Sequence, residues 1–373
     1  MIQPASLYDF LQKKGVHFYA GVPDSLLRSF LTYVQEKAGN NEHIITANEG
    51  LAVGLAAGHY FSTGSIPLVY LQNSGLGNII NPLTSLADKE MYGVPMILLI
   101  GWRGRPGTKD EPQHLKMGRV TLNLLEAMEI PVFELKENEA KCFSIIEESM
   151  NVALKQKTPV ALLAPDGIFN NYETPEAKNR YTLQREKVIA QIIDRCRGDE
   201  IIVCTTGKIG REFYEQNNKA GRKISKYFLS VGAMGHANHI ALGLKLHSEN
   251  RVIMLDGDGA LLMHMGALPT IARHAGSGFI HIIINNGGHE SVGGQPTGAF
   301  KIDFSTLGES CGYKKTEEIR NGKELKEWLA NSFDERVSSL VEIRTNLASR
   351  NDLGRPSGTP EEWKNNFMKA LKG

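Results

Sequence analysis

The stretch Gly257-Asp258-Gly259-Ala260-Leu261-Leu262-Met263 decides how the second half of this chain folds. An apolar run, 251–255, leads into it, and after a helix-like segment the chain reaches Ile282-Ile283-Ile284-Asn285-Asn286. The order is strand, tight acidic turn, helix, strand and polar turn, so the two strands are expected to be neighbours in a parallel sheet. Glycines on both sides of Asp258 allow a sharp turn and a close approach to a ligand.

Asp258 and the two asparagines place oxygen atoms at two neighbouring strand ends. Such oxygens suit Mg²⁺, which keeps few protein ligands and completes its octahedron with water and phosphate oxygens. An isolated Gly-Asp-Gly is also a common turn sequence, and the stretch has no G-x-G-x-x-G dinucleotide fingerprint. A plain turn and a magnesium site both remain possible interpretations on these residues alone.

Composition limits the class of protein. A length of 373 residues predicts two domains, and a hydrophobic content of 41% is enough for substantial cores. The net charge of +1 gives no general attraction to nucleic acid or membranes. No apolar run approaches the roughly 18 to 20 residues that cross a bilayer, and residues 1–4 show no secretory signal. Four scattered cysteines without a C-x-x-C pair indicate a reducing, cytoplasmic location.

Residues 1–165 alternate short apolar strands with helices, which predicts a doubly wound α/β domain with a parallel sheet. Helices are expected at 5–14, from 26, at 51–60, at 119–128 and at 138–156, with a polar loop over 101–118. Strands are expected at 17–20, 44–47, 66–71, 95–100, 131–134 and 159–164. Ligands bind at the carboxyl ends of such strands, where Asp24, Glu49 and Asn73 lie.

The polar segment 166–185 shows little apolar periodicity and is interpreted as a linker. Residues 186–373 return to the α/β pattern, with one further helix and strand expected within 303–343 and a terminal helix from about 359. Thr206-Gly207-Lys208 follows the first strand of this half. It is either an ordinary strand-to-helix turn or a helix start that presents backbone N–H groups to a diphosphate.

The Gly-Asp-Gly turn, with Asn286 placed 286 − 258 = 28 positions after Asp258, resembles the motif of thiamine diphosphate (ThDP) enzymes. Residues 48–58, Asn-Glu-Gly-Leu-Ala-Val-Gly-Leu-Ala-Ala-Gly, resemble the pyrimidine-side motif of ThDP decarboxylases. The resemblance covers the whole chain. It implies a pyrimidine-binding domain at 1–165, the linker, and a diphosphate-binding domain at 186–373, without a middle domain.

The resemblance also implies roles for individual residues. Glu49, which could otherwise be a surface residue that caps the next helix, promotes the reactive tautomer of the cofactor pyrimidine. Met234, which could otherwise fill a core, bends ThDP. Mg²⁺ is held by Asp258, the side chain of Asn286 and the Gly288 carbonyl. Further cofactor contacts are expected at Asn73, Gly207, Lys208, Gly232, Gly257, Gly259 and Ala260. Because the cofactor of this superfamily lies between two subunits, a homodimer or larger homo-oligomer is expected.

Three stretches, 21–25, 110–114 and 289–297, resemble the compact phosphonopyruvate and sulfopyruvate decarboxylases. The last stretch and the undivided chain favour the phosphonate enzyme. The expected reaction is decarboxylation of 3-phosphonopyruvate to phosphonoacetaldehyde in phosphonate biosynthesis. Sulfopyruvate decarboxylation, or a ThDP-binding regulatory module without turnover, are the alternatives.

Two sets of residues are candidates for the substrate chemistry. His and carboxyl groups can be tuned to exchange protons near neutral pH, and the candidates of this kind are Asp24, His114, His289 and Glu290. Basic side chains suit phosphonate oxygens, although each one could also be a solvated residue of a basic loop. These candidates are Arg28, Arg103, Arg105 and Lys109.

Overall fold

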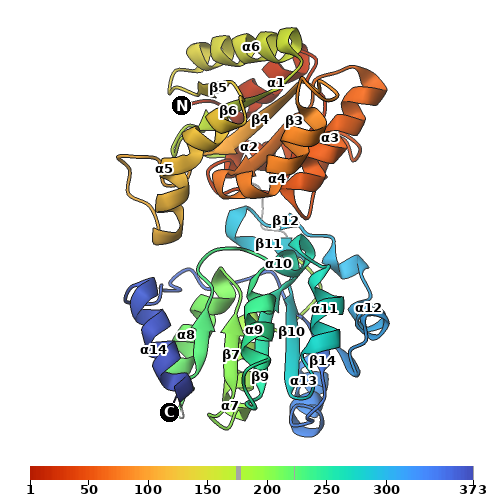
Figure 1. The fold of residues 1–373 in the computed structure, drawn as a ribbon, viewed down its shortest axis with the longest axis vertical. Helices are drawn as coiled ribbons and strands as arrows, with labels where there is room; N and C mark the ends of the chain where they lie inside the picture. The colour runs from red at the N-terminus through yellow and green to blue at the C-terminus, as the bar shows by residue number, and fades with distance from the viewer. Residues whose placement is uncertain (174–177, 222, 373) are drawn as a thin grey trace. The chain divides into compact units, whose positions relative to one another are not determined.

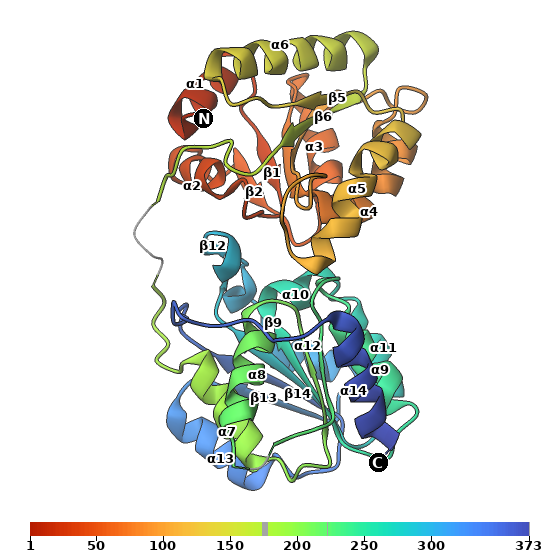
Figure 2. The same ribbon diagram turned by 90° about the vertical axis from the view of Figure 1, so that its left-hand side faces the viewer.

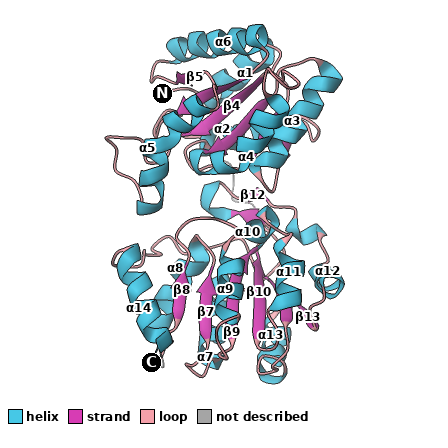
Figure 3. Cartoon of the chain, in the orientation of Figure 1, coloured by secondary structure: helices cyan, strands magenta, loops and turns pink. Residues whose placement is uncertain are grey.

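The computed structural model describes residues 1–173, 178–221 and 223–372. The chain forms two compact units, Met1–Glu176 and Ala177–Gly373, each built on a six-stranded parallel sheet (Figures 1 and 3). The division falls within the polar segment 166–185. The described residues hold no third unit, and the α/β fold with two doubly wound sheets agrees with the prediction. No helix of the described residues is long and apolar enough to cross a membrane.

The sheet of the first unit has the strand order β2-β1-β3-β4-β6-β5. Its strands are β1 (Tyr19–Gly21), β2 (His43–Ile45), β3 (Leu68–Gln72), β4 (Met96–Gly101), β5 (Val132–Glu134) and β6 (Pro159–Ala164). Its helices are α1 (Pro4–Lys13), α2 (Arg28–Lys37), α3 (Glu49–Thr63), α4 (Leu76–Pro82), α5 (Pro112–Ala127) and α6 (Glu139–Gln156). Two short turns flank α4, a 3₁₀ turn at Asn73–Gly75 and a π turn at Leu83–Ala87.

Both faces of this sheet are covered by helices. Side chains alternate along a strand, so Leu68 and Tyr70 of β3 pack with α1, α2 and α6, whereas Val69 and Leu71 pack with α3, α4 and α5. Burial on both faces explains why these strands are continuous apolar runs in the sequence.

The sheet of the second unit has the strand order β13-β14-β10-β9-β7-β8. Its strands are β7 (Ile201–Cys204), β8 (Tyr227–Leu229), β9 (Val252–Gly257), β10 (Phe279–Asn285), β13 (Lys315–Ile319) and β14 (Ser339–Arg344). Its helices are α7 (Arg185–Arg195), α8 (Lys208–Lys219), α9 (Ala237–Lys245), α10 (Asp258–Met263), α11 (Ala267–His274), α12 (Phe304–Cys311), α13 (Gly322–Asn331) and α14 (Pro360–Lys372). A small antiparallel ribbon pairs β11 (Gly288–His289) with β12 (Gln295–Pro296).

The helices of this unit also form two layers. Helices α7, α8 and α13 pack on one face of the sheet, and α9, α10, α11 and α12 pack on the other. Figure 2 shows α7 and α13 on one side and α9 and α11 on the opposite side. In a parallel sheet the carboxyl ends of all strands lie at the same edge. The turns after β7, β9 and β10 lie at that edge.

The two sheets share one strand order. When the strands of each parallel sheet are numbered within their own unit, both orders become 2-1-3-4-6-5. In both units strand 2 lies on one side of strand 1 and strand 3 lies on its other side, so the direction of the connections reverses at strand 1. Such a reversal opens a crevice at the carboxyl ends of strands 1 and 3, where α/β proteins bind ligands. These strands are β1 and β3 in the first unit, and β7 and β9 in the second.

Three elements differ from the sequence-based expectation. Helix α5 begins at Pro112 instead of 119, since proline is favoured in the first turn of a helix, and His114 therefore lies on a helix. Residues 303–343 form two helices and two strands instead of one of each. The strand β13 was not expected because it lies at the sheet edge, is only partly buried and is polar. The helical segment after Asp258 is divided into α10 and α11.

Candidate active site

A pocket of about 100 Å³ lies at the carboxyl ends of β7, β9 and β10 in the second unit. With the exception of Gly232, it gathers every residue of this unit that the sequence predicts to bind cofactor or metal or to transfer a proton. Gly232 lies in the loop after β8, where its carbonyl accepts a 2.7 Å hydrogen bond from Ser230 Oγ. The lining residues are Arg185, Thr205, Thr206, Gly207, Lys208, Ile209, Met234, Gly257, Asp258, Gly259, Ala260, Ile284, Asn286, Gly288, His289, Glu290 and Ser291.

Asp258 is the first residue of α10, and only 4% of it is exposed. Burial raises the pKa of its carboxyl to about 6, against hydrogen bonds from Thr297 and from the backbone that favour the charged form. Asn286 follows β10, and its Oδ1 accepts from Gly288 N at 3.1 Å. No group of three or more His, Cys, Asp and Glu side chains able to hold a metal exists in the described residues. One carboxylate with amide and carbonyl oxygens is a donor set that suits Mg²⁺ bound to a phosphate ligand.

The turn after β7 is suited to an anionic ligand. Gly207 has a φ of 97°, which favours glycine, and α8 begins at the next residue. The N–H groups of a first helical turn have no partner within their own helix. The buried hydroxyl of Thr205 has no hydrogen-bond partner among the described residues. Donors of this kind at a helix N-terminus fit a diphosphate.

Met234 and His289 meet at Gly259. A Cβ placed on Gly259 would lie 3.2 Å from His289 Cε1 and 3.4 Å from Met234 Cε. Gly235, with a φ of 84°, lets the loop that carries Met234 pack onto α10, where a Cβ would lie 2.9 Å from the Ala260 carbonyl oxygen. Burial lowers the pKa of His289 to about 4. Its imidazole is therefore neutral near pH 7.

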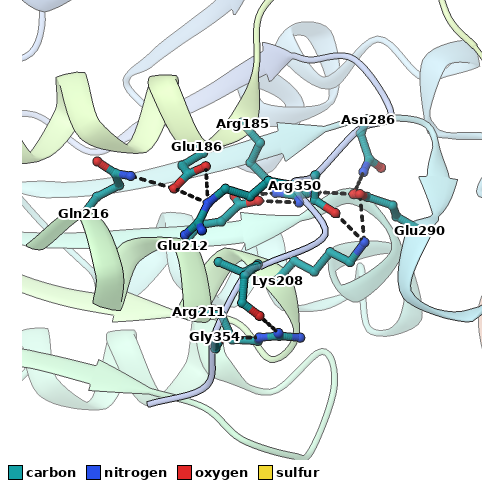
Figure 4. Close-up of polar contacts among 12 residues, drawn as sticks. Arg185, Glu186, Lys208, Arg211, Glu212, Gln216, Asn286, Glu290, Arg350 and Gly354 are labelled. Atoms are coloured by element: carbon teal, nitrogen blue, oxygen red, sulfur yellow. Dashed lines mark hydrogen bonds and ion pairs between the residues drawn. The ribbon is translucent and has the colours of Figure 1, made fainter. Parts of the chain in front are cut away.

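Glu290 belongs to a cluster of buried ion pairs (Figure 4). Arg185 binds Glu212 through two 2.7 Å hydrogen bonds and Glu290 through one of 2.5 Å. Lys208 Nζ lies 2.9 Å from Glu290 Oε1, and Asn286 Nδ2 donates to Glu290 Oε2 at 3.1 Å. Burial alone would raise the pKa of Glu290, but Arg185 and Lys208 hold it below its usual value. These contacts make Glu290 an ionised anchor and give no support to its predicted role in proton transfer.

The same cluster ties the segment before α14 to α7 and α8. Arg350 binds Glu186, as Figure 4 shows. Arg350 also binds Glu215, and Gly354 N donates to Glu215 Oε1 at 2.7 Å. Ser349 Oγ accepts from Lys208 Nζ at 2.6 Å. Lys208, at the mouth of the α8 turn, is thereby held from both sides. No local sequence spacing points to Glu186, Glu215, Ser349 or Arg350, because these positions are far apart in the chain.

Glu49 is the first residue of α3 in the first unit, and 5% of it is exposed. Its Oε2 accepts a 2.7 Å hydrogen bond from Asn78 Nδ2. A Cβ on Gly75 would lie 2.4 Å from Oε1, so the carboxyl fits a slot that only glycine leaves open. Burial raises the pKa of Glu49, against the hydrogen bond from Asn78. A carboxyl with a raised pKa keeps its proton more readily and can offer it to a neighbouring nitrogen base.

Asp24 follows β1 and is fully buried. Its Oδ1 accepts from Gln72 Nε2 at 2.8 Å, and its Oδ2 accepts from Leu26 N at 2.7 Å. Burial raises its pKa, while these bonds and the charge of Arg103 act in the opposite direction. His114, on α5, has a pKa lowered first by burial and then by Arg103.

Asn73 is fully buried and joins the ends of β3 and β4. Its Nδ2 donates to the Arg103 carbonyl at 2.8 Å and to Thr121 Oγ1 at 3.0 Å, and its Oδ1 accepts from Arg103 N at 3.2 Å. The side chain of Asn73 is therefore engaged within the unit, and its expected contact with the cofactor stays a prediction.

Comparisons with known proteins match both units. Residues 4–122 match the N-terminal TPP (thiamine pyrophosphate) binding domain of thiamine pyrophosphate enzymes, and residues 206–343 match the C-terminal TPP binding domain. Over 98% of its length the chain is 31% identical to a phosphonopyruvate decarboxylase of Streptomyces viridochromogenes and 30% identical to one of Streptomyces hygroscopicus, covering 94% and 93% of them. It is 28% identical to a sulfopyruvate decarboxylase of Methanosarcina acetivorans, over 97% of the chain and 96% of that protein.

Proposed function

Since this chain belongs to the thiamine diphosphate-dependent decarboxylase family that includes the phosphonopyruvate decarboxylases, we propose that it converts 3-phosphonopyruvate to phosphonoacetaldehyde and CO₂. The observation that carries the proposal is the pocket in which the Asp258 turn, Asn286 and the α8 turn meet. The names of the two Streptomyces relatives favour the phosphonate acid, and that of the Methanosarcina relative makes sulfopyruvate the alternative. We place the proposed reaction in phosphonate biosynthesis.

Each unit contributes different groups to this reaction. When bound, ThDP would supply a carbon nucleophile for the ketone and a cationic thiazolium ring that can take up the electron pair left by CO₂. Asp258, Asn286 and the Gly288 carbonyl would hold Mg²⁺, while Thr205 and the α8 turn would hold phosphate oxygens. Met234 would support the cofactor ring beside Gly259. Glu49 would hold a proton at N1′ of the pyrimidine.

A proton must replace CO₂ on the substrate carbon. Asp24 suits this step, because burial raises its pKa and favours its protonated form. His114 is a second candidate, and as a largely neutral imidazole it would accept the proton of an acid or relay it. Glu290 would instead keep Arg185 and Lys208 in place.

We include a homodimer in the proposal, because Glu49 belongs to one unit and Asp258 to the other. The expected arrangement pairs the first unit of one copy with the second unit of its partner. Mixing inactive Glu49→Gln and Asp258→Asn variants tests it. If sites form between copies, random mixed dimers regain roughly a quarter of wild-type activity, since half of the dimers are mixed and each holds one intact site. If no activity returns although mixed dimers form, the site lies within one copy.

Steady-state kinetics test the reaction itself. We expect kcat/KM for 3-phosphonopyruvate to exceed that for 3-sulfopyruvate at least about tenfold, and an equal or reversed ratio would contradict the choice of substrate. We expect Glu49→Gln to lower kcat by about 100-fold or more while calorimetry shows ThDP still bound. A regulatory module without turnover predicts no decarboxylation by the wild-type chain.

A further inference from the structure

We propose that Arg103 and Ser25 form the subsite that binds the tetrahedral anionic end of the substrate, a phosphonate or sulfonate group. This inference rests on the proposed function and assigns one part of the substrate to named residues. Both residues follow strands of the first sheet, Ser25 after β1 and Arg103 after β4. Both lie at the edge of the sheet where the strands end, which is also where the proton-transfer candidates Asp24 and His114 lie.

Arg103 and Ser25 carry hydrogen-bond donors that no described residue uses. Arg103 NH1 donates to Ser25 Oγ at 2.8 Å, and its Nε and NH2 bind the carboxylate of Asp110. A guanidinium carries five N–H donors, so two of them, one on each terminal nitrogen, have no acceptor within the described part of the chain. Ser25 Oγ accepts from Arg103, and its own hydrogen is free to be donated. In the proposal these three donors serve the oxygens of one tetrahedral anion.

Asp110 holds this guanidinium in place. Besides Arg103, its carboxylate accepts from Gly104 N and Glu111 N, both at 2.7 Å. The side chains of Arg103 and Asp110 are only 20% and 11% exposed. Asn73 fixes the backbone of Arg103 through its N–H and its carbonyl. An arginine held in this way loses little conformational freedom on binding, which favours selective recognition of a bidentate anion.

The subsite lies beside the groups that handle the proton. Ser25 follows Asp24 directly, and the charge of Arg103 acts on the pKa of both Asp24 and His114, after the larger effect of burial. A three-carbon acid separates its anionic end from its ketone by one carbon, so the two ends must be recognised close together. In the proposal Arg103 and Ser25 provide this recognition next to Asp24.

The other basic candidates have different surroundings. Arg105 pairs with Glu134 at 2.6 Å and lies over the Trp102 ring at 5.5 Å, toward β5. Arg28 and Lys109 are exposed to solvent. The substitution Arg105→Gln is therefore a matched control. It removes a guanidinium from the same loop, but one that pairs with Glu134.

Calorimetry of the holoenzyme with phosphonoacetate and with sulfoacetate, which carry the anionic end but no ketone, tests the subsite. We expect Arg103→Gln to weaken binding of the preferred anion about 10- to 100-fold, as for a charged hydrogen-bonding group. Ser25→Ala, which leaves the Arg103–Asp110 pair intact, should weaken it about 3- to 10-fold. Arg105→Gln should leave it unchanged. Retained ThDP affinity in each variant shows that the fold is intact.

The outcomes separate this inference from the proposed function. If Arg103→Gln and Ser25→Ala bind both anions as tightly as the wild type, the subsite is wrong even when the wild type decarboxylates phosphonopyruvate. If the wild type binds these anions through Arg103 but decarboxylates neither acid, the subsite stands and the proposed function fails. Equal weakening by Arg103→Gln and Arg105→Gln would point to general loop charge and also overturn the assignment.

Discussion

The hydroxyl of Thr297 donates a 2.5 Å hydrogen bond to Oδ2 of Asp258. Thr297 follows the β12 ribbon, and its own N–H donates to the Gly287 carbonyl at 3.1 Å, which fixes the position of the hydroxyl. The contact orients the one carboxylate of the proposed magnesium site and joins it to the loop after Asn286. The hydrogen bond therefore fixes the loop after Asn286 and the Asp258 turn relative to each other, and both would contribute ligands to a bound metal.

Replacement of Thr297 by Val tests this orientation. The change keeps the shape and removes the hydroxyl, so the charged form of Asp258 loses a hydrogen bond and its pKa rises further. We expect apparent Mg²⁺ affinity near pH 6.5 to fall about tenfold, with a smaller loss at pH 8. Magnesium titrations at constant ThDP measure it. Unchanged affinity at both pH values would show that Thr297 does not orient the ligand.

Binding of magnesium should depend on pH through Asp258. The pKa of this group is raised to about 6, and the metal binds the charged carboxylate, so a proton competes with the metal below that value. We expect affinity to be nearly constant between pH 7 and 8 and to fall about tenfold per pH unit below about 5.5. Calorimetric Mg²⁺ titrations between pH 5 and 8 measure the profile. Asp258→Asn should bind weakly and lose the pH dependence, and a profile flat to pH 5 in the wild type would exclude Asp258 as the competing group.

Gly75 and Gly77 form a matched pair for the role of Glu49. A Cβ on Gly75 would lie 2.4 Å from Glu49 Oε1, whereas one on Gly77 would meet nothing within 4 Å. Gly75 has ordinary helical backbone angles, so Gly75→Ala acts through this contact alone. We expect it to displace the carboxyl and lower kcat about 100-fold, while Gly77→Ala behaves like the wild type. Similar kcat values for the two variants would show that the reaction does not depend on the position of the Glu49 carboxyl.

Glu290 should matter to stability more than to the proton transfer. Glu290→Gln leaves the buried Arg185 with Glu212 as its remaining carboxylate, and we expect a loss of about 2–3 kcal/mol in the free energy of unfolding at pH 7. Because the folded-state pKa of Glu290 is depressed, this contribution is present above about pH 4.5 and is lost as the pH falls through the folded value. Urea unfolding measures it.

Glu327→Gln provides the control, since its pair with Lys323 is exposed and 3.8 Å long and should contribute almost nothing. A Glu290→Gln variant with wild-type stability and a greatly lowered kcat would instead place Glu290 in the chemistry.

Much of the fold followed from local sequence signals. The buried strands β6 and β9 and the Asp258 turn were predictable because apolar runs ending at glycine or polar residues mark strand ends in parallel sheets. The edge strand β13 was not, since its sequence Lys-Thr-Glu-Glu-Ile shows no such run. The break between α10 and α11 was missed because the backbone turn at His264 leaves little trace in the apolar pattern.

The residues of the site were predictable only where they lie in compact motifs. Glu49, Asp258 and Asn286 each stand in a short recognisable segment. Asn78 contacts Glu49 in the first unit, while Thr297 contacts Asp258 and Arg185 contacts Glu290 in the second. Hydroxyl, amide and guanidinium groups of this kind occur throughout the chain, so no short motif marks them. The sequence could not rank the four basic candidates either. Arg103 and Arg105 differ in their partners, Asp110 and Glu134, which only the structure reveals.

The shared strand order makes positions in the two units topologically equivalent. The third strand of each unit ends at such a pair, Asn73 after β3 and Asp258 after β9. In the first unit this position carries a neutral amide that is fully engaged with Arg103 and Thr121. In the second unit it carries a buried carboxyl whose pKa is raised. The same place in one topology therefore serves as a neutral structural tie in one unit and as an ionisable group in the other.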